Sequence, residues 1–364
     1  RGVWHFDGAD WQRLGRDGGL PGWSVRSLLH AGNGDLWVAT DAPSRLSRLR
    51  AGEWVAVPGP EGLGPIRALA EGPDGCIWAG TANGEILRVE DGRLVNQLAA
   101  ERELPFLSVR DLHATGDGSL WVGFAWDGIG CLKDGGFHQF TTAHGLQDDY
   151  VSQLISDDRG GLWVAANRGL FRFKVEELLA VARGESTQVR CRAYAQGEAL
   201  PSLQPSRNNS PSSWRRRDGR LCFAMLNGLV VVQPREVRDE PPKPQVAIEK
   251  VTLEGRAIAR YAGDAYWPNS GGVKLPALAG PDVELEIPAD HQQLAFHVAA
   301  LSFSSPENVY FRYRLDGHDG DWIQTQDEAL VKYPHLKAGN YEFRVAASNG
   351  SGTWTQAVAR VRLR

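Results

Sequence analysis

The sequence lacks the features that would build a helix-rich, metal-binding or membrane-embedded protein. It contains one methionine and few apolar patterns of helical period, which argues against an α-rich fold. No apolar run approaches the length of a membrane-spanning helix. The nine histidines are scattered, and no His-x-x-x-His pair lies on an expected helix, so we predict neither a metal site nor a cofactor.

Cysteine is scarce and shows no functional spacing. The four cysteines, Cys76, Cys131, Cys191 and Cys222, form no C-x-x-C pair of the kind that binds zinc or carries out redox chemistry. Each lies in or beside an apparent strand, so we interpret all four as buried free thiols. A Cys191–Cys222 disulfide is the alternative if the compartment is oxidising.

Excess positive charge is absent as well. Lysine and arginine total 40 against 44 aspartate and glutamate, which gives a formal net charge of −4. No basic run is long enough to follow a phosphate backbone, so we predict that this segment binds no nucleic acid. No signal peptide is evident, and because the chain starts at Arg1 rather than methionine, we expect a segment of a longer protein.

What the chain does contain is a short phrase that occurs four times. The copies begin at Val25, Ile66, Val109 and Val151, and each joins two apolar strands through a glycine-containing turn. Each second strand carries a tryptophan, at positions 37, 78, 121 and 163, so the repeats lie 41, 43 and 42 residues apart. A period of about 40–50 residues built from short strands is typical of a β-propeller with one four-stranded blade per repeat.

The repeated tryptophans are expected to pack between blades, because a single sheet cannot bury both of its faces alone. Small residues follow these tryptophans and suit a close approach of neighbouring sheets: Ala39, Gly80, Gly123 and Ala165.

The pattern is incomplete on either side of the four repeats. Residues 1–14 resemble the last two strands of a blade, and residues 175–184 are predicted to form a short helix that ends at Gly184. A last repeat over 212–234 provides three strands and no fourth, which the N-terminal strand pair could supply by ring closure. Five to six blades are recognisable, as in a closed small ring or in part of a longer propeller region.

Prolines and charges over 239–244 predict a linker between two domains. Beyond it the repeat period is lost, and about seven short strands of alternating pattern indicate an immunoglobulin-like sandwich. The predicted fold class is therefore all-β, with a β-propeller over 1–238 followed by an immunoglobulin-like β-sandwich over 245–364.

The repeats resemble the two-component regulator propeller repeat. Its phrase is matched by Gly19-Leu20-Pro21, Val25, Leu28 and Leu36-Trp37, and again from Gly145-Leu146 through Leu162-Trp163 to Gly169-Leu170. The C-terminal stretch Phe311–Trp322, with Tyr333 and Gly339–Val345, is similar to the triple-tyrosine (Y_Y_Y) domain that follows such propellers.

This resemblance implies the periplasmic sensor region of a membrane histidine kinase, often a hybrid kinase, or of a transcriptional regulator. It implies a transmembrane helix and cytoplasmic signalling domains after residue 364. Many relatives respond to oligosaccharides, so the implied partner is an oligosaccharide or another small ligand.

A second copy of the receptor is the other expected partner. A sensor must pass a binding event through the membrane, and a stiff propeller offers no evident two-state element. We therefore expect the C-terminal sandwich to pair two protomers as a homodimer in the full-length receptor. The alternative is that the sandwich is only a spacer.

No arrangement of catalytic residues is evident, so we predict that this segment is not an enzyme. His113 and His138 lie at strand positions and are interpreted as packing or surface residues. The adjacent carboxylates Asp148-Asp149 and Asp157-Asp158 are explained by solvated turns, since neighbours on a strand point to opposite faces. A polysaccharide lyase or hydrolase, or a protein-interaction scaffold, stays as the alternative.

Candidate ligand-binding residues lie in the loops that lead into first strands and the loops that follow second strands, because these gather on one face of a propeller. Aromatic side chains beside amides and carboxylates suit sugar rings. Loop anchoring is the alternative for Trp126 and Tyr150, and turn formation is the alternative for Asn208. The candidates are Trp23, Trp126, Asp127, Asp149, Tyr150, Arg168, Asn208 and Asn209.

Overall fold

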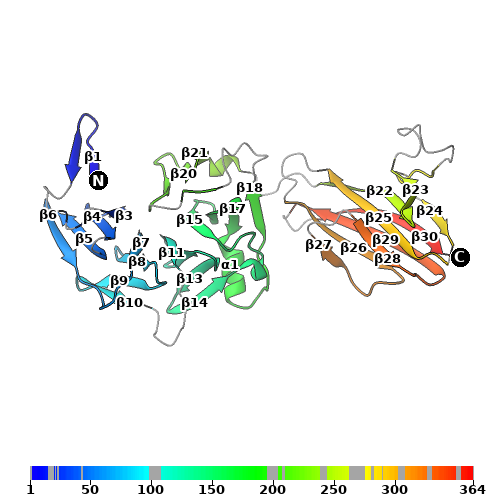
Figure 1. Ribbon diagram of the computed structural model, residues 1–364, viewed down its shortest axis with the longest axis horizontal. Helices are drawn as coiled ribbons and strands as arrows, with labels where there is room; N and C mark the ends of the chain where they lie inside the picture. The colour runs from blue at the N-terminus through cyan, green and yellow to red at the C-terminus, as the bar shows by residue number, and fades with distance from the viewer. Residues whose placement is uncertain are drawn as a thin grey trace. The chain divides into compact units, whose positions relative to one another are not determined.

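The protein is represented by a computed structural model in which the chain divides into two compact units, Arg1–Val237 and Arg238–Arg364. We call them the propeller unit and the sandwich unit, and Figure 1 shows the strands of each. The structure describes residues 2–14, 20, 22, 24–41, 44–97, 108–194, 204–206, 210–237, 244–261, 275–279, 283–288, 290–301, 308–325, 330–349 and 354–363.

Four sheets of the propeller unit share one topology, with four antiparallel strands hydrogen-bonded in chain order. The first blade contains β3 (Val25–His30), β4 (Leu36–Asp41), β5 (Ser44–Arg50) and β6 (Glu53–Val57). The second contains β7 (Ile66–Glu71), β8 (Ile77–Thr81), β9 (Ile86–Glu90) and β10 (Arg93–Asn96). The third contains β11 (Val109–Ala114), β12 (Leu120–Phe124), β13 (Ile129–Lys133) and β14 (Gly136–Phe140). The fourth contains β15 (Val151–Ser156), β16 (Gly161–Ala166), β17 (Gly169–Lys174) and β18 (Cys191–Tyr194).

The predicted helix is α1 (Val175–Ala182), and it lies between the third and fourth strands of the fourth blade. The predicted last repeat forms a fifth sheet of three strands, namely β19 (Ser213–Arg215), β20 (Leu221–Met225) and β21 (Gly228–Val232). The all-β prediction is therefore confirmed.

The N-terminal strands do not complete the fifth sheet, although the sequence indicated that they could do so by closing the ring. β1 (Val3–Phe6) and β2 (Trp11–Leu14) pair only with each other among the described strands. Val3 packs instead with Leu20 and Val38 against the first blade. The fifth sheet is left with the large apolar side chains of Trp214, Leu229 and Val231 exposed.

The ring is closed at its axis, where the first strands of the blades lie in Figure 1. Ser27 of β3 forms a parallel bridge with Ser210, just before β19. Leu28 N donates to Ser210 O at 3.0 Å, and Ser210 N donates to Arg26 O at 3.0 Å. Two backbone hydrogen bonds therefore join the first blade to the segment leading into the fifth sheet.

The repeated tryptophans fill the space between blades, as predicted. Trp37, Trp121 and Trp163 are buried, whereas Trp78 is half-buried. Separate apolar clusters join the first blade to the second, the second to the third, the third to the fourth, and the fourth to the fifth sheet. A Cβ added at Gly80 would lie 2.4 Å from Val109 Cγ1, so the absence of a side chain there allows the close approach.

An aspartate in the first turn ties each blade together. Asp157 accepts hydrogen bonds from Gly161 N at 2.7 Å, Trp163 Nε1 at 2.8 Å and Arg172 Nε at 2.8 Å. Arg172 also lies over the Trp163 ring, 5.9 Å from its centroid. The expectation of a solvated turn is therefore wrong for Asp157, because its carboxylate is buried beneath these donors.

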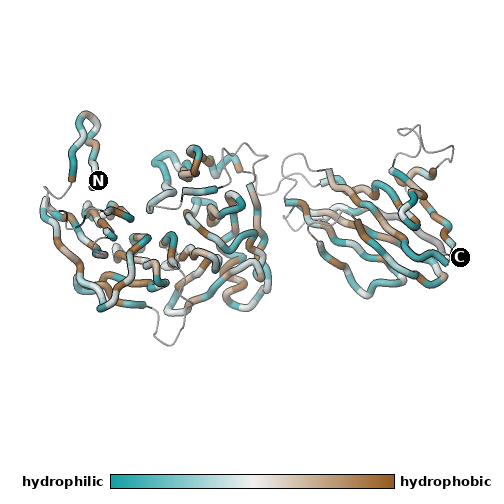
Figure 2. Tube along the Cα trace, viewed as in Figure 1, coloured by the Kyte–Doolittle hydropathy of each residue, from teal (hydrophilic) through white to brown (hydrophobic). Residues whose placement is uncertain are grey.

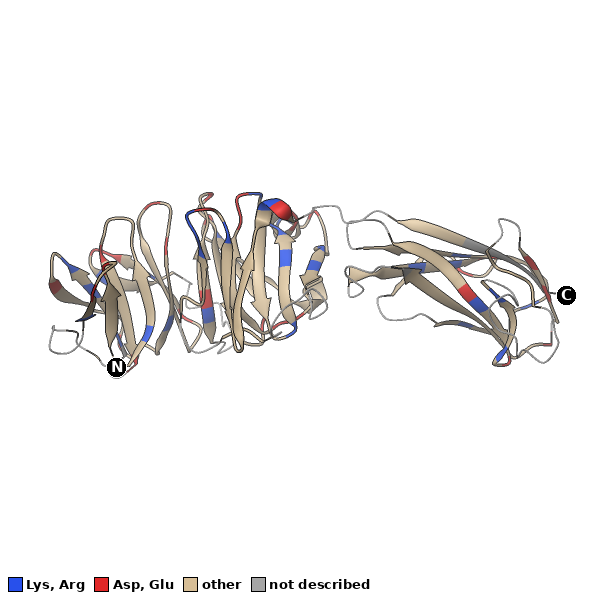
Figure 3. Ribbon diagram, turned by 90° about the horizontal axis from the view of Figure 1, so that it is seen from above, with Lys and Arg blue, Asp and Glu red and all other residues tan. Residues whose placement is uncertain are grey.

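Parts of this clamp recur in the other blades, although the indole N–H groups of Trp37 and Trp121 find no acceptor among the described residues. In the first and second blades an arginine again lies over the tryptophan, as Arg48 over Trp37 and Arg88 over Trp78. In the third blade Lys133 takes this place and donates to Asp117 at 2.6 Å. Hydrophilic and hydrophobic segments are interspersed along this unit (Figure 2). The second strands of the third and fourth blades are buried along their whole length, as expected for sheets covered on both faces. Charged residues of the propeller unit lie largely at strand ends and turns (Figure 3).

The sandwich unit has two sheets around one apolar core. Phe296 and Phe343 stack at its centre, with ring centroids 3.9 Å apart. The four-stranded sheet has the order β23 (Arg256–Arg260), β22 (Gln245–Leu253), β25 (Gln293–Leu301), β28 (Leu330–Pro334). The five-stranded sheet has the order β24 (Glu284–Ile287), β30 (Thr355–Leu363), β29 (Gly339–Ser348), β26 (Tyr310–Asp316), β27 (Ile323–Thr325).

We predict that Asp157→Asn lowers the free energy of unfolding of the propeller unit by about 3 kcal/mol, because it leaves the buried Arg172 guanidinium without its anion. Asp158→Asn is the matched control, since Asp158 is on the surface and faces Arg215 at 3.6 Å; it should cost less than about 1 kcal/mol. Denaturant unfolding followed by circular dichroism measures both. Equal effects of the two changes would contradict the clamp.

Candidate functional site

The predicted site residues that the structure describes lie in loops of the third and fourth blades. Trp126 and Asp127 follow β12, Asp149 and Tyr150 lead into β15, and Arg168 follows β16. These positions share one end of the blades, because the start of each first strand pairs with the end of the second, as Val151 with Ala166. The remaining predicted positions, Trp23, Asn208 and Asn209, lie outside the described residues.

Trp126 is presented to solvent by a tight loop. Its side chain is 71% exposed, and its φ of 79° places a non-glycine residue in the left-handed region. The loop is fixed because Gly128 N donates to Asp149 O at 2.8 Å and Phe124 N donates to Gly128 O at 3.0 Å. Backbone strain of this kind persists only where the surroundings impose it, and it concentrates at binding sites.

Tyr150 packs against this tryptophan. The two rings meet edge to face with centroids 4.9 Å apart, while Tyr150 is only 5% exposed. Arg110 of β11 lies over the same tyrosine ring, 5.5 Å from its centroid. Tyr150 therefore anchors the loop, and of the two aromatic residues only Trp126 offers a broad surface to a ligand.

The polar candidates mostly stabilise the loops. Asp149 accepts from Thr142 N at 2.7 Å and from Thr142 Oγ1 at 2.9 Å. Asp127 accepts from the Gln139 amide, which also donates to the Asp127 carbonyl at 2.9 Å. The exposed Arg168 donates its backbone N–H to Asp148 at 2.9 Å. These carboxylates already have donors, so they orient the loop around Trp126.

Sequence reasoning did not single out Arg110, which joins this group of residues through Tyr150. The information was present in the repeats, since Arg26 and Arg67 occupy the same place in the first and second copies. Superposing the repeats on one another, residue by residue, would have found this set.

Two buried titratable side chains lie on β11 near the axis of the ring. Asp111 accepts a hydrogen bond from Leu154 N at 2.7 Å and another from Ser210, and burial raises the pKa of its carboxyl to about 7. His113 accepts from Ser156 N at 2.9 Å, and burial, with a smaller contribution from Arg215, lowers its pKa to about 4. His113 is thus a packing residue, as expected.

The two groups make stability depend on pH in opposite directions. Between about pH 4 and 7 the folded state keeps a proton on Asp111 that the unfolded chain has lost, so this stabilising contribution falls as pH rises. Between about pH 6.5 and 4 the unfolded chain protonates His113 while the folded state does not, so its contribution falls as pH drops. The two slopes offset each other over most of this range.

We predict that Asp111→Asn removes the first slope. The difference in unfolding free energy between this variant and the wild type should then rise by about 1.4 kcal/mol per pH unit between pH 4 and 7. Any hydrogen bond of Asp111 that this substitution removes changes the difference in unfolding free energy by the same amount at every pH. For His113→Gln, the unfolding free energy of the variant minus that of the wild type should fall as pH rises from about 4 to 6.5. Denaturant unfolding at several pH values measures both variants. A difference for Asp111→Asn that is flat with pH would exclude a titrating carboxyl at this position.

Other chemistry finds little support in the part of the chain that the structure describes. It contains no group of three or more metal-ligating side chains. All four cysteines are free thiols, and burial raises the pKa of Cys131 to about 12. None of the helices described is long and apolar enough to cross a membrane.

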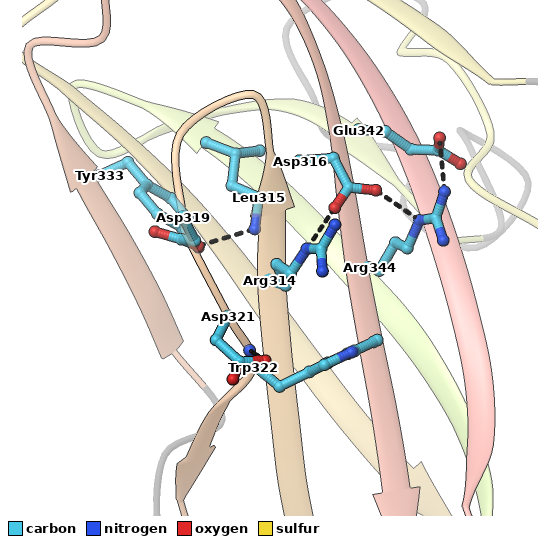
Figure 4. Close-up of polar contacts among 9 residues, drawn as sticks. All are labelled: Arg314, Leu315, Asp316, Asp319, Asp321, Trp322, Tyr333, Glu342 and Arg344. Carbon is cyan, nitrogen blue, oxygen red and sulfur yellow. Dashed lines mark hydrogen bonds and ion pairs between the residues drawn. The ribbon is translucent and has the colours of Figure 1, made fainter.

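The sandwich unit carries a polar network on and around β26 (Figure 4). Asp319 accepts from Tyr333 Oη at 2.7 Å and from Leu315 N at 2.7 Å, and this raises the Tyr333 pKa beyond the effect of burial. Asp316 binds Arg314 at 2.5 Å and Arg344 at 2.8 Å. Asp319 therefore links the turn after β26 to Tyr333 on β28 of the other sheet, and Asp316 links β26 to β29.

Residues 302–364 match the Y_Y_Y domain, which confirms the predicted resemblance at the C-terminus. The fold is similar to that of the extracellular domain of BT3049 from B. thetaiotaomicron, a protein assigned to a hybrid two component system, with a TM-score of 0.68 and 18% identity. The match covers 93% of this chain and 44% of that chain, so this chain spans less than half of the BT3049 domain. At this identity the likeness establishes the fold alone.

Two further solved structures are less similar. The extracellular domain of BT4673 from B. thetaiotaomicron has a TM-score of 0.45 and 14% identity, covering 94% of this chain and 56% of that one. Virginiamycin B lyase from Staphylococcus aureus has a TM-score of 0.44 and 13% identity, covering 92% of this chain and 94% of that one. Neither supports a conclusion about this chain. No curated protein sequence matches it significantly.

Proposed function

We propose that this chain is an extracytoplasmic ligand-sensing segment of a two-component signalling receptor, on the periplasmic side of the inner membrane. The observation that carries the proposal is the combination of a Y_Y_Y domain with a fold like that of the BT3049 extracellular domain over 93% of the chain. The propeller unit binds the ligand, and the sandwich unit relays the event. Histidine kinase activity belongs to another part of such a receptor.

The ligand in this proposal is an oligosaccharide held at Trp126. A strained loop that holds an indole in solvent costs stability, so we expect Trp126 to have a role in binding. Sugar rings stack on flat aromatic faces, which makes an oligosaccharide a suitable ligand for this indole. Tyr150 and the hydrogen-bonded carboxylates keep the indole in place before the ligand arrives. A surface organised in advance loses less entropy on binding.

We predict that Trp126→Ala weakens oligosaccharide binding about tenfold or more and leaves the fold intact, because it removes the stacking surface. Isothermal titration with a panel of neutral and acidic oligosaccharides measures affinity, and the same mixtures are assayed for product. Trp11→Ala is the matched control, since Trp11 is an exposed tryptophan on the N-terminal hairpin, 65% accessible.

Unchanged affinity in Trp126→Ala, with a ligand that binds the wild type, would place the site elsewhere. Turnover by catalytic amounts of protein would support a polysaccharide-active enzyme instead. Binding of no oligosaccharide in the panel would count against the sensing of sugars.

For the relay, the proposal assigns pairing of two protomers to the sandwich unit. Its two sheets are stiffened by hydrogen-bonded carboxylates and a stacked aromatic core, so it is suited to move as one body. Relative movement of two rigid bodies is a common way to transmit ligand binding. The membrane and cytoplasmic parts would raise the local concentration of the two copies.

We predict that cysteines placed on the outer sheet face crosslink two subunits of the full-length receptor, with a yield that ligand changes. Gln324→Cys and Gln356→Cys test the five-stranded sheet, and Glu249→Cys and Lys332→Cys test the four-stranded sheet, since all four positions are exposed. Cys76 is half-buried, so Cys76→Ser removes the most accessible of this chain's four thiols. A receptor that signals but crosslinks at none of these positions would leave the sandwich unit as a spacer.

A further inference from the structure

The first strand of each of the four blades contains a β-bulge at the same place. The register shifts between Val25 and Ser27 in the first blade and at the equivalent step in the other three. The extra residue is an arginine in three blades and a serine in the fourth. These residues are Arg26, Arg67, Arg110 and Ser152.

A bulge changes where a side chain points. The extra residue is left out of the strand pairing and interrupts the alternation of the two faces, and bulges are over-represented beside binding sites for this reason. All four bulges lie at the start of a first strand, so they share the blade end that also carries Trp126 and Asp41. We call Arg26, Arg67 and Arg110 the bulge arginines.

The first two bulge arginines converge on a single carboxylate. Arg26 forms an ion pair with Asp41, and Arg67 Nη1 lies 3.9 Å from the same Asp41 oxygen. Their side chains are 33% and 29% exposed. Two guanidinium groups thus approach the same carboxylate oxygen.

The third bulge arginine has no carboxylate partner in the described part of the chain. Arg110 is half-buried above the Tyr150 ring, and its Nε is fully buried without a hydrogen-bond partner among the described residues. The equivalent Ser152 is buried, and its hydroxyl oxygen likewise finds no partner there. A buried Nε of this kind also occurs in Arg48 and Arg88, so what sets Arg110 apart from the other bulge arginines is that no described carboxylate pairs with it.

Carboxylates near Arg110 do not take the place of a ligand. Asp148 accepts from Tyr150 N at 2.9 Å and from Arg168 N at 2.9 Å, and Asp149 is bound to Thr142. Their charge weakens the long-range attraction of anions to this face, but their oxygens are already engaged. Specific contact with an anionic group therefore falls to Arg110.

We propose that the bulge arginines recognise the carboxylate or sulfate group of an acidic oligosaccharide, with Arg110 as the principal contact. A guanidinium donates two parallel hydrogen bonds that match the geometry of either group. Tyr150 contacts both Arg110 and Trp126, so a sugar ring on the indole has a neighbouring ring within reach of the guanidinium. The inference rests on the ligand-binding function proposed above.

The test compares sugars that differ only in charge. Isothermal titration of the whole chain uses oligogalacturonate and its methyl ester, chondroitin disaccharides with and without sulfate, and neutral gluco-, xylo- and manno-oligosaccharides. We expect binding of at least one acidic sugar, loss of binding when its charge is removed, and weaker binding as the salt concentration rises.

The variants locate the contact. Arg110→Gln should lower the affinity for the acidic sugar about 10- to 100-fold, and Arg110→Lys should lower it less, because it keeps the charge and loses the paired donors. Arg67→Gln should have a smaller effect than Arg110→Gln. Arg93→Gln is the matched control, since Arg93 is exposed on the outer strand of the second blade and should bind as the wild type does.

Two results would overturn the inference, and they differ in what they leave standing. If neutral sugars bind as well as acidic ones and binding depends on Trp126 but not on Arg110, the sensing function stands and anion recognition is wrong. If no sugar of either kind binds the correctly folded chain, the proposed ligand class and the inference both fail.

Discussion

Burial of a large ring between facing sheets is the interaction on which the propeller unit depends. Each blade has two faces to cover and no helix layer to cover them, so neighbouring blades must supply the partner surface. Trp121 and Trp163 are fully buried in this role. The close approach also demands small residues opposite, and at Gly80 the added Cβ would overlap the next blade. Blade spacing, the turn clamps and the shared end that holds the loops all follow from this packing.

The blades were predictable because each repeat contains its own turn, its own tryptophan and its own strand pattern, so local preference and tertiary packing agree. The repeat gave no guidance where a strand lacked these features. β18 (Cys191–Tyr194) comes after a helix and out of phase with the repeat, and only its pairing with β17 makes it a strand. The N-terminal hairpin had an acceptable strand pattern, but its apolar residue Val3 found a partner in the first blade rather than in the fifth sheet.

The candidate site was predictable in part. The exposure of Trp126 follows from its place in a loop after a second strand, which the repeat fixes. The burial of Tyr150 does not, because it depends on a contact between loops of different blades. Arg110 was overlooked because its place in the strand pattern looks like an ordinary solvent-facing position. A β-bulge at Arg110 changes the direction of its side chain. The bulge depends on how β11 pairs with β12, and the periodicity of the sequence does not reveal it.

The closure between Ser27 and Ser210 has a mechanical consequence. Consecutive blades are joined by broad apolar layers, whereas the described part of the first blade meets the segment before the fifth sheet through two backbone hydrogen bonds. Nearest-neighbour coupling of this kind makes the array behave as a strip whose ends are held by a clasp. No apolar cluster of the described residues spans the clasp, so opening it there costs less than separating two adjacent blades. Thermal fluctuations of the unit should therefore begin at this seam and spread along the strip from its two ends.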